Sequence, residues 1–182
     1  MNKVIAIVGL AGSGKSEISS ILKKRKLPVI RFGDITDNEL KRLGLKRNEK
    51  NEKIVRENVR KRYGMGAYAK LNIPKINNLL ESSNVVIDGL YSWEEYKVLK
   101  KEYDKRLVII AVYTPPHLRY KRLSKRRIRP LTKKEAEERD YSEIENINKA
   151  GPIAMADFTI INDGNLNDLK SNVNEVLKEI GI

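Results

Sequence analysis

The sequence predicts an α/β fold of three layers, in which helices cover both faces of a five-stranded parallel sheet. Short apolar runs alternate with longer segments of helical periodicity, an order typical of parallel α/β proteins. Several of these runs are unbroken blocks of Val and Ile, as expected of strands that are buried on both faces. The five predicted strands span residues 4–8, 28–32, 85–87, 107–113 and 158–161.

Helix start signals follow the third and fourth predicted strands. Ser92 and Glu95 have the spacing of a capping box, in which each side chain bonds the backbone of the other residue. Thr114 precedes Pro115 and Pro116, a combination that predicts an N-cap and a first-turn proline. Both segments are therefore predicted to be helical.

Two further helices are predicted towards the C-terminus. Thr132 and Glu135 form a second capping-box sequence, and the helix that they open should stop by the Gly-Pro pair at 151–152. The last helix should run from about Asn165. Between the second and third strands, the region from 34 to 80 is predicted to form several short helices beside the sheet, where a second substrate could bind. It is interrupted by Gly44, Gly64, Gly66 and Pro74.

Length and composition predict one intracellular domain. A chain of 182 residues suits a single domain, and the absence of cysteine excludes disulfides and thiolate metal sites. No apolar run is long enough to span a bilayer or to form a secretory signal. We therefore expect a cytoplasmic protein that does not bind membranes.

The charge is strongly positive, because 37 Lys and Arg residues outnumber 24 Asp and Glu residues, which gives a formal net charge of +13. Such a protein attracts polyanions. The segment 119–134 contains no acidic residue, and its target is either the phosphates of a small ligand or a nucleic acid backbone. Its basic residues are Arg119, Lys121, Arg122, Lys125, Arg126, Arg127, Arg129, Lys133 and Lys134.

Residues 9–16 match the phosphate-binding pattern G-x-x-x-x-G-K-[ST] in full. Glycines let the backbone curl so that N–H groups point at phosphate oxygens, and the N-terminus of the following helix adds positive charge. Lys15 is expected to reach the β- and γ-phosphates, and Ser16 to ligate Mg²⁺. The pattern predicts a P-loop NTPase fold that binds ATP or GTP, with ATP preferred. The predicted nucleotide-binding residues are Gly9, Ala11, Gly12, Ser13, Gly14, Lys15, Ser16 and Glu17.

Two aspartates follow predicted strands. Asp88, at the end of the third strand, is expected to hold Mg²⁺ directly or through water; alone, an Asp before Gly is a turn residue. Asp34 follows the second strand and points to the crevice at the carboxyl ends of the strands. It either orients or deprotonates the acceptor or caps the next helix.

Arginines in and after the basic segment suit a lid over phosphates. Arg119, Arg122 and Arg126 are spaced by three and four residues, so they are expected to share one helix face. Guanidinium groups there could neutralise the charge that develops in phosphoryl transfer; the alternative is an RNA-binding patch. Arg139 either pairs with Glu143 or provides a second phosphate contact.

The order of these motifs resembles the adenylate kinase superfamily of P-loop kinases. More closely, most of the chain resembles an archaeal family described as adenylate-kinase-related or dephospho-coenzyme-A-kinase-like. The shared features are the phosphate loop, Gly33-Asp34, Val-Ile-Asp88-Gly89, the Arg122 to Arg127 segment, Arg139-Asp140, Ala156-Asp157 and Asn162 to Gly164.

The resemblance implies a nucleoside-monophosphate-kinase-like fold with a helical acceptor region at about 34–80 and a basic lid at about 126–134. It implies that Arg122 lies against the adenine or ribose of ATP, and that Arg126 and Arg139 contact phosphates. It further implies that the turn from Asn162 to Gly164 contacts the base. On this view the catalytic residues are Lys15, Asp34, Arg126 and Arg139.

One departure concerns the acceptor. Adenylate kinases have a Pro-Arg pair after Asp-Gly, and that arginine binds the acceptor monophosphate, whereas Leu-Tyr-Ser follows Gly89 in this chain. The predicted acceptor-binding residues are Arg31, Asp34, Arg56, Arg60, Asp88 and Gly89. The predicted function is ATP-dependent phosphoryl transfer with AMP as the leading acceptor. The alternatives are a dephospho-coenzyme-A-type kinase and a nucleotide-binding switch that docks RNA.

Overall fold

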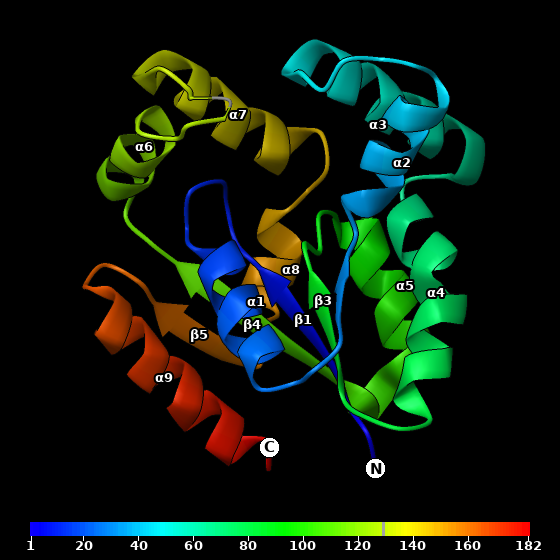
Figure 1. Ribbon diagram of the computed structural model, residues 1–182, viewed down its shortest axis with the longest axis vertical. Helices are drawn as coiled ribbons and strands as arrows, with labels where there is room; N and C mark the ends of the chain where they lie inside the picture. The colour runs from blue at the N-terminus through cyan, green and yellow to red at the C-terminus, as the bar shows by residue number, and fades with distance from the viewer. Residues whose placement is uncertain (129) are drawn as a thin grey trace.

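Five parallel strands form one sheet in the order β2-β3-β1-β4-β5 in the computed structural model, which describes residues 1–128 and 130–182 (Figure 1). β1 lies at the centre and pairs with β3 and β4, with Val4 opposite both Val85 and Leu107. The predicted five-stranded parallel sheet is confirmed. The strands are β1 (Val4–Val8), β2 (Val29–Arg31), β3 (Val85–Asp88), β4 (Leu107–Tyr113) and β5 (Phe158–Ile161).

The helices connect these strands and account for most of the remaining chain. A short 3₁₀ helix, η1 (Asp104–Arg106), precedes β4. The α-helices are α1 (Lys15–Lys24), α2 (Asp34–Arg42), α3 (Glu49–Tyr63), α4 (Ala67–Leu80), α5 (Trp93–Tyr103), α6 (Pro116–Ser124), α7 (Lys133–Glu145), α8 (Ala150–Ala154) and α9 (Leu166–Glu179).

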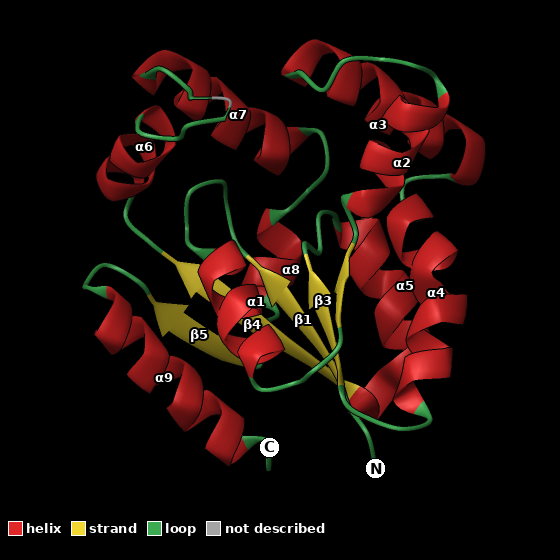
Figure 2. Ribbon diagram, in the orientation of Figure 1, coloured by secondary structure: helices red, strands yellow, loops and turns green. Residues whose placement is uncertain are grey.

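The helices cover both faces of the sheet, as the sequence predicts (Figure 2). α1 and α9 pack on one face, and α4 and α5 on the other. The side chains of β1 alternate between the two cores: Val4, Ala6 and Val8 lie in one, and Ile5 and Ile7 in the other. Every residue of β1 is fully buried. A strand buried on both faces has no polar side, which explains its unbroken apolar sequence.

One predicted interruption is wrong, and one predicted helix end is confirmed. Pro74 does not interrupt the acceptor region but lies inside α4. The helix after Thr132 ends at Glu145, before the Gly-Pro pair at 151–152, which lies inside the separate short helix α8. Pro152 is the third residue of α8, where an N–H group would have no intrahelical partner, so proline is tolerated there.

The helix caps agree with the sequence in part. Thr132 forms the predicted capping box with Glu135, and Asn165 caps α9. Ser92 accepts a hydrogen bond from the Glu95 N–H, so it is the N-cap of α5. Thr114 does not cap α6: the N-cap is Pro115, and the threonine hydroxyl bonds to other loops instead.

The elements place several loops at the carboxyl end of the sheet. The loop after β1 lies there, with α6 and α7 above it on one side and α2 and α3 on the other (Figure 1). In parallel α/β proteins, ligands bind at this edge. Among the described residues, no helix has both the length and the apolar character needed to cross a membrane.

Candidate active site

The loop of residues 9–14 joins β1 to α1 and has the backbone shape of a phosphate-binding loop. Gly12 and Gly14 have φ angles of 81° and 100°, in the left-handed region that glycine adopts readily. Gly14 is the N-cap of α1 and has no side chain to cap it. The N–H groups of the first helical turn lack intrahelical partners, and they favour an anion at this position.

Side chains from distant segments hold the carbonyl groups of this loop. Arg119 donates from Nη1 to the Ala11 carbonyl at 3.2 Å. Ser13 presents its carbonyl to the Thr114 hydroxyl at 3.0 Å and to the Asn162 amide at 2.7 Å. Arg119, Thr114 and Asn162 are all buried. The loop is therefore clamped from the ends of β4 and β5 and from α6.

Lys15 lies at the start of α1 and donates from Nζ to the Gly9 and Leu10 carbonyls, at 2.7 and 3.0 Å. Burial, together with the nearby charge of Lys149, lowers the pKa of Lys15 to about 7. Phosphate oxygens would be stronger partners than these carbonyls, because a bond between two charged groups is stronger than one to a neutral acceptor.

Ser16 and Asp88 have the chemistry of a Mg²⁺ site. Ser16 lies exposed in the first turn of α1, and Asp88 ends β3 directly opposite Ile7 of β1. Burial raises the pKa of Asp88 above its ordinary value, and the positive charge of Lys15 opposes that shift. Among the described residues, no group of three or more acidic or histidine side chains could hold a metal ion alone. One hydroxyl and one carboxylate fit Mg²⁺ that is completed by nucleotide phosphates and water.

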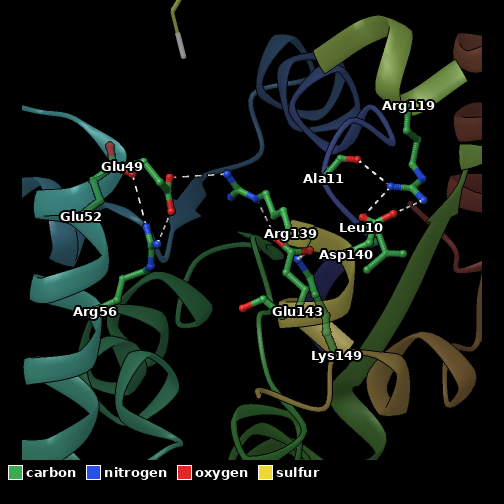
Figure 3. A network of polar contacts seen from close by, with 12 residues as sticks. Leu10, Ala11, Glu49, Glu52, Arg56, Arg119, Arg139, Asp140, Glu143 and Lys149 are labelled. Atoms are coloured by element: carbon green, nitrogen blue, oxygen red, sulfur yellow. Dashed lines mark hydrogen bonds and ion pairs between the residues drawn. The ribbon is translucent and has the colours of Figure 1, made fainter. Parts of the chain in front are cut away.

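A network of charges that includes Lys15 lies beside the loop (Figure 3). The Lys149 ammonium is 2.8 Å from the Glu143 carboxylate, and the Arg139 guanidinium is 3.2 Å from the same carboxylate. Burial opposes ionisation of Glu143, but Lys149, Arg139 and Lys15 outweigh it and lower its pKa to about 2. One carboxylate is thus shared by three cations next to the predicted phosphate site.

Arg139 also connects two sides of the site. It extends from α7 and reaches Glu49 of α3 at 3.6 Å, while Glu49 pairs with Arg56 at 2.6 Å (Figure 3). The predicted Arg139–Glu143 pair is therefore present. Contact of Arg139 with a phosphate stays a prediction.

The prediction that Arg119, Arg122 and Arg126 share one helix face is wrong for Arg126, whereas Arg119 and Arg122 both reach Thr114 from α6. Arg119 is only 3% exposed, and its guanidinium binds Asp140 through two bonds of 2.8 and 2.6 Å. Arg122 points back to the Thr114 hydroxyl at 3.3 Å. α6 ends at Ser124, so Arg126 lies beyond the helix.

The predicted lid, about 126–134, therefore coincides mainly with the connection between α6 and α7. Arg126 is exposed in this connection. Arg129, also part of the predicted lid, lies outside the described residues. The contacts of Arg122 and Arg126 with a nucleotide stay predictions.

Arg31 and Asp34 come together at the end of β2. The guanidinium of Arg31 donates to Asp34 at 2.7 Å and pairs with Asp37 as well. Asp34 is the first residue of α2 and makes no side-chain cap, because Gly33 is the N-cap. The helix-capping alternative for Asp34 is therefore wrong.

The other two candidate arginines differ in their partners. Arg56 pairs with Glu49 at 2.6 Å and with Glu52 at 3.4 Å. Arg60 lies over the Tyr68 ring, with its guanidinium carbon 5.4 Å from the ring centre, and its Nε–H has no hydrogen-bond partner among the described residues. Arg31 and Arg56 are each matched by two carboxylates, whereas Arg60 makes no acidic contact of that kind in the described chain.

Gly89 and the turn after β5 pack closely. A side chain at Gly89 would meet the Tyr91 ring, since a Cβ there would lie 2.6 Å from the tyrosine oxygen. Asn162 donates its amide to the phosphate loop, and Gly164 packs against Asp168 of α9. Contact of Asn162 and Gly164 with the base stays a prediction.

Several polar residues of the site gave no clear signal in the sequence. Lys149 stands in no known motif, and burial of a lysine cannot be read from composition. Glu95 was identified only as a capping residue, yet it is fully buried and accepts a bond from the Tyr91 N–H at 2.8 Å. Asp140 follows Arg139 in the sequence, but nothing in the sequence indicates that its partner is Arg119.

Known proteins resemble this chain in sequence and in fold. The AAA domain family matches residues 5–146. A UPF0200 protein of Thermococcus gammatolerans is 36% identical over 181 residues, which cover 97% of this chain and 95% of that protein. The chain belongs to the UPF0200 family.

Solved structures similar to this UPF0200 chain include kinases. Shikimate kinase from Bacteroides thetaiotaomicron superposes with a TM-score of 0.63 at 15% identity, covering 99% of both chains. Dephospho-CoA kinase from Campylobacter jejuni gives a TM-score of 0.59 at 19% identity, covering 99% of this chain and 98% of that one. The UPF0200 chain therefore has the α/β fold of P-loop kinases, as predicted; its place in the adenylate kinase branch stays a prediction.

Proposed function

We propose that the protein is a kinase that transfers the γ-phosphoryl group of Mg·ATP to a small acceptor. The observation that carries this proposal is the set of charges at the phosphate loop. Lys15, Lys149 and Arg139 supply positive charge, and Asp88 supplies a carboxylate. Lys149, Arg139 and Asp88 are all close enough to Lys15 to act on its pKa. Phosphoryl transfer depends on such positioned charges more than on covalent chemistry.

Each residue has a role in the proposal. Lys15 binds the β- and γ-phosphates, while Ser16 and Asp88 would hold Mg²⁺, which would supply positive charge against the charge that develops in phosphoryl transfer. Arg139 and Arg126 contact the transferring phosphoryl group. Asp34, which lies exposed at the carboxyl end of β2, orients or deprotonates the acceptor hydroxyl.

The ion pairs of the arginines in the acceptor region indicate which chemical group of the acceptor binds there. A phosphomonoester such as AMP needs arginines with spare positive charge, but Arg31 and Arg56 are each paired with two carboxylates. This favours an acceptor that approaches as an alcohol rather than as a phosphate, in the manner of the dephospho-coenzyme-A-type alternative. The similarity of the fold to shikimate kinase and dephospho-CoA kinase supports the same choice.

AMP remains the second candidate, because Arg60 lacks an acidic partner of this kind. The experiment is ADP formation from Mg·ATP with AMP, dephospho-coenzyme A or shikimate as acceptor. We expect an alcohol acceptor to stimulate ADP formation and AMP to stimulate it less. If only AMP stimulates turnover, the monophosphate kinase is correct; if RNA binds tightly and no acceptor stimulates turnover, the protein is the RNA-docking switch.

A further inference from the structure

Three polar side-chain atoms of α3 and α5 are buried without a hydrogen-bond partner among the described residues. They are Nε of Arg60, in α3, and Oε2 of Glu94 and Oε1 of Glu95, in α5. The other oxygen of Glu94 lies 3.9 Å from the Lys97 ammonium, so the donor of Arg60 and the acceptor of Glu95 are the atoms considered below. Glu95 is completely buried. Native proteins leave few such atoms unpaired, because each loses its hydrogen bonds to water without replacement. A donor and an acceptor left unpaired in one region indicate a group that binds both.

The two side chains share one environment. The charge of Arg60 acts on the Glu95 carboxylate, and both groups act on the Tyr68 hydroxyl. Arg60 lies over the Tyr68 ring, and the Tyr68 hydroxyl bonds to Thr36 at 2.7 Å. Even so, no direct hydrogen bond or ion pair joins Arg60 to Glu95 in the described chain. The two groups are near each other but too far apart to bond.

The position of this pair connects it to the rest of the site. The second oxygen of Glu95 accepts from the Tyr91 N–H at 2.8 Å. Tyr91 packs against Gly89 at the end of β3, and the Lys149 ammonium lies 5.5 Å from the centre of its ring. Arg60 and Glu95 thus lie near the carboxyl end of β3. They are on the side of the sheet where α3 and α4 form the predicted acceptor region.

The chemistry of the pair selects a hydroxyl group. The missing partner must accept from the Arg60 N–H and donate to the Glu95 oxygen, and an alcohol does both. A phosphate dianion only accepts, and it would be repelled by the carboxylate; an ammonium only donates. Burial raises the pKa of Glu95 to about 7, so both forms of the carboxyl occur near neutral pH. A hydroxyl can bond to either form.

We propose that Arg60 and Glu95 bind a hydroxyl group of the phosphoryl acceptor, so that the acceptor is a polyhydroxylated compound. The proposal rests on the proposed kinase function, because it needs an acceptor. It concerns recognition, and the hydroxyl at Arg60 and Glu95 is separate from the one that receives the phosphoryl group. The structural alternative is a buried water molecule that bridges the two side chains.

Two substitutions separate these explanations. Glu95→Gln keeps an oxygen for the Tyr91 N–H but replaces the unpaired oxygen with an NH₂ donor. Arg60→Lys keeps the charge and removes the Nε–H. Matched controls are Glu102→Gln, an exposed residue of the same helix α5, and Arg62→Lys, which lies over the Tyr63 ring.

The probes are dephospho-coenzyme A, shikimate and D-gluconate, and their binding is measured by calorimetry in the presence of Mg·ADP. For the probe that binds wild type, we expect both variants to raise the dissociation constant, and the KM in turnover, at least tenfold. The KM for ATP should change less than twofold, and the controls should behave as wild type.

The proposal is overturned if both variants bind the probe as wild type does while losing thermal stability, because the pair then binds structural water. It is also overturned if no alcohol probe binds the wild type. Mg·ATP binding to the wild type, measured separately, distinguishes failure of this proposal from failure of the proposed kinase function. If no alcohol probe binds but Mg·ATP does, only the acceptor assignment fails. If Mg·ATP does not bind either, the kinase function fails as well.

Discussion

The Lys149 ammonium donates to the Glu143 carboxylate at 2.8 Å from a side chain that is only 2% exposed. A lysine is rarely buried so deeply without an acidic partner. Because the same carboxylate bonds Arg139 and influences Lys15, the pair fixes the charge beside the phosphate loop.

Glu143→Gln should destabilise the protein and change its response to acid. It leaves the Lys149 charge buried without its partner, a loss of about 3–5 kcal/mol in the free energy of unfolding. The pKa of Glu143 is lowered from 4.5 to about 2 by folding, so its stabilisation is complete above pH 4.5 and is lost as the pH falls towards 2. Urea denaturation at several pH values should show that, as the pH falls from 4.5 towards 2, the free energy of unfolding decreases less in the variant than in the wild type.

The control for that experiment is Glu145→Gln, an exposed residue of the same helix. Glu143→Gln combined with Lys149→Met should recover part of the lost stability, because the unpaired charge is removed as well. If Glu143→Gln unfolds at the same urea concentration as wild type, the buried pair does not stabilise the fold.

Thr114→Val should weaken nucleotide binding more than folding. The hydroxyl that donates to the Ser13 and Asn162 carbonyls is lost, while the shape of the side chain is kept. We expect the dissociation constant for Mg·ATP to rise about tenfold, equivalent to about 1.4 kcal/mol, a typical value for one hydrogen bond. Calorimetry measures this, with Thr159→Val on β5 as an exposed control; equal affinities for Thr114→Val and wild type would mean that the clamp does not shape the loop.

Asp88→Asn should reduce turnover and raise the Mg²⁺ concentration needed for half-maximal activity, because the amide is a poorer ligand than the carboxylate. Turnover should fall roughly a hundredfold, the range for the loss of one electrostatic contact to a transition state. Thermal stability should not fall, since burial disfavours the ionised form of Asp88. A variant that only melts earlier, with normal activity per folded molecule, would make Asp88 a turn residue; exposed Asp104→Asn is the control.

Arg126→Ala distinguishes a kinase lid from an RNA patch. A lid arginine acts on the transferring phosphoryl group, so turnover should fall about a hundredfold and ATP affinity only slightly. In an RNA patch, the same change would weaken RNA binding modestly and reduce its salt dependence by about one unit. Lys125→Ala, equally exposed, is the control. Loss of RNA affinity with unchanged turnover would contradict the lid.

The sequence predicted the sheet well because most strands are short, mainly apolar runs. Residues 4–8, 107–113 and 158–161 match β1, β4 and β5, since runs of this length between helical segments favour strands over helices. One error in the helices falls at a proline. Pro74 lies within α4, although the intrinsic helix propensity of proline is the lowest of all residues.

The site was predictable only where a motif fixes the chemistry. The phosphate loop follows from its glycines and Lys15, but the residues that surround it come from distant segments. Arg119 lies in a run of basic residues, yet it is buried because Asp140, 21 residues later, pairs with it. Charge alone does not show which member of a basic segment turns inward, and tertiary packing decides it.

The most direct test of the central claim is phosphoryl transfer itself, followed by ³¹P NMR of the acceptor with Mg·ATP and the wild-type protein. The account predicts a new phosphomonoester signal on an alcohol acceptor. Lys15→Ala should remove this signal and keep the fold, because Lys15 contributes to the phosphate site rather than to the core. If Mg·ATP binds the wild type and no acceptor gains a phosphoryl group, or if Lys15→Ala transfers it at the wild-type rate, the account is contradicted.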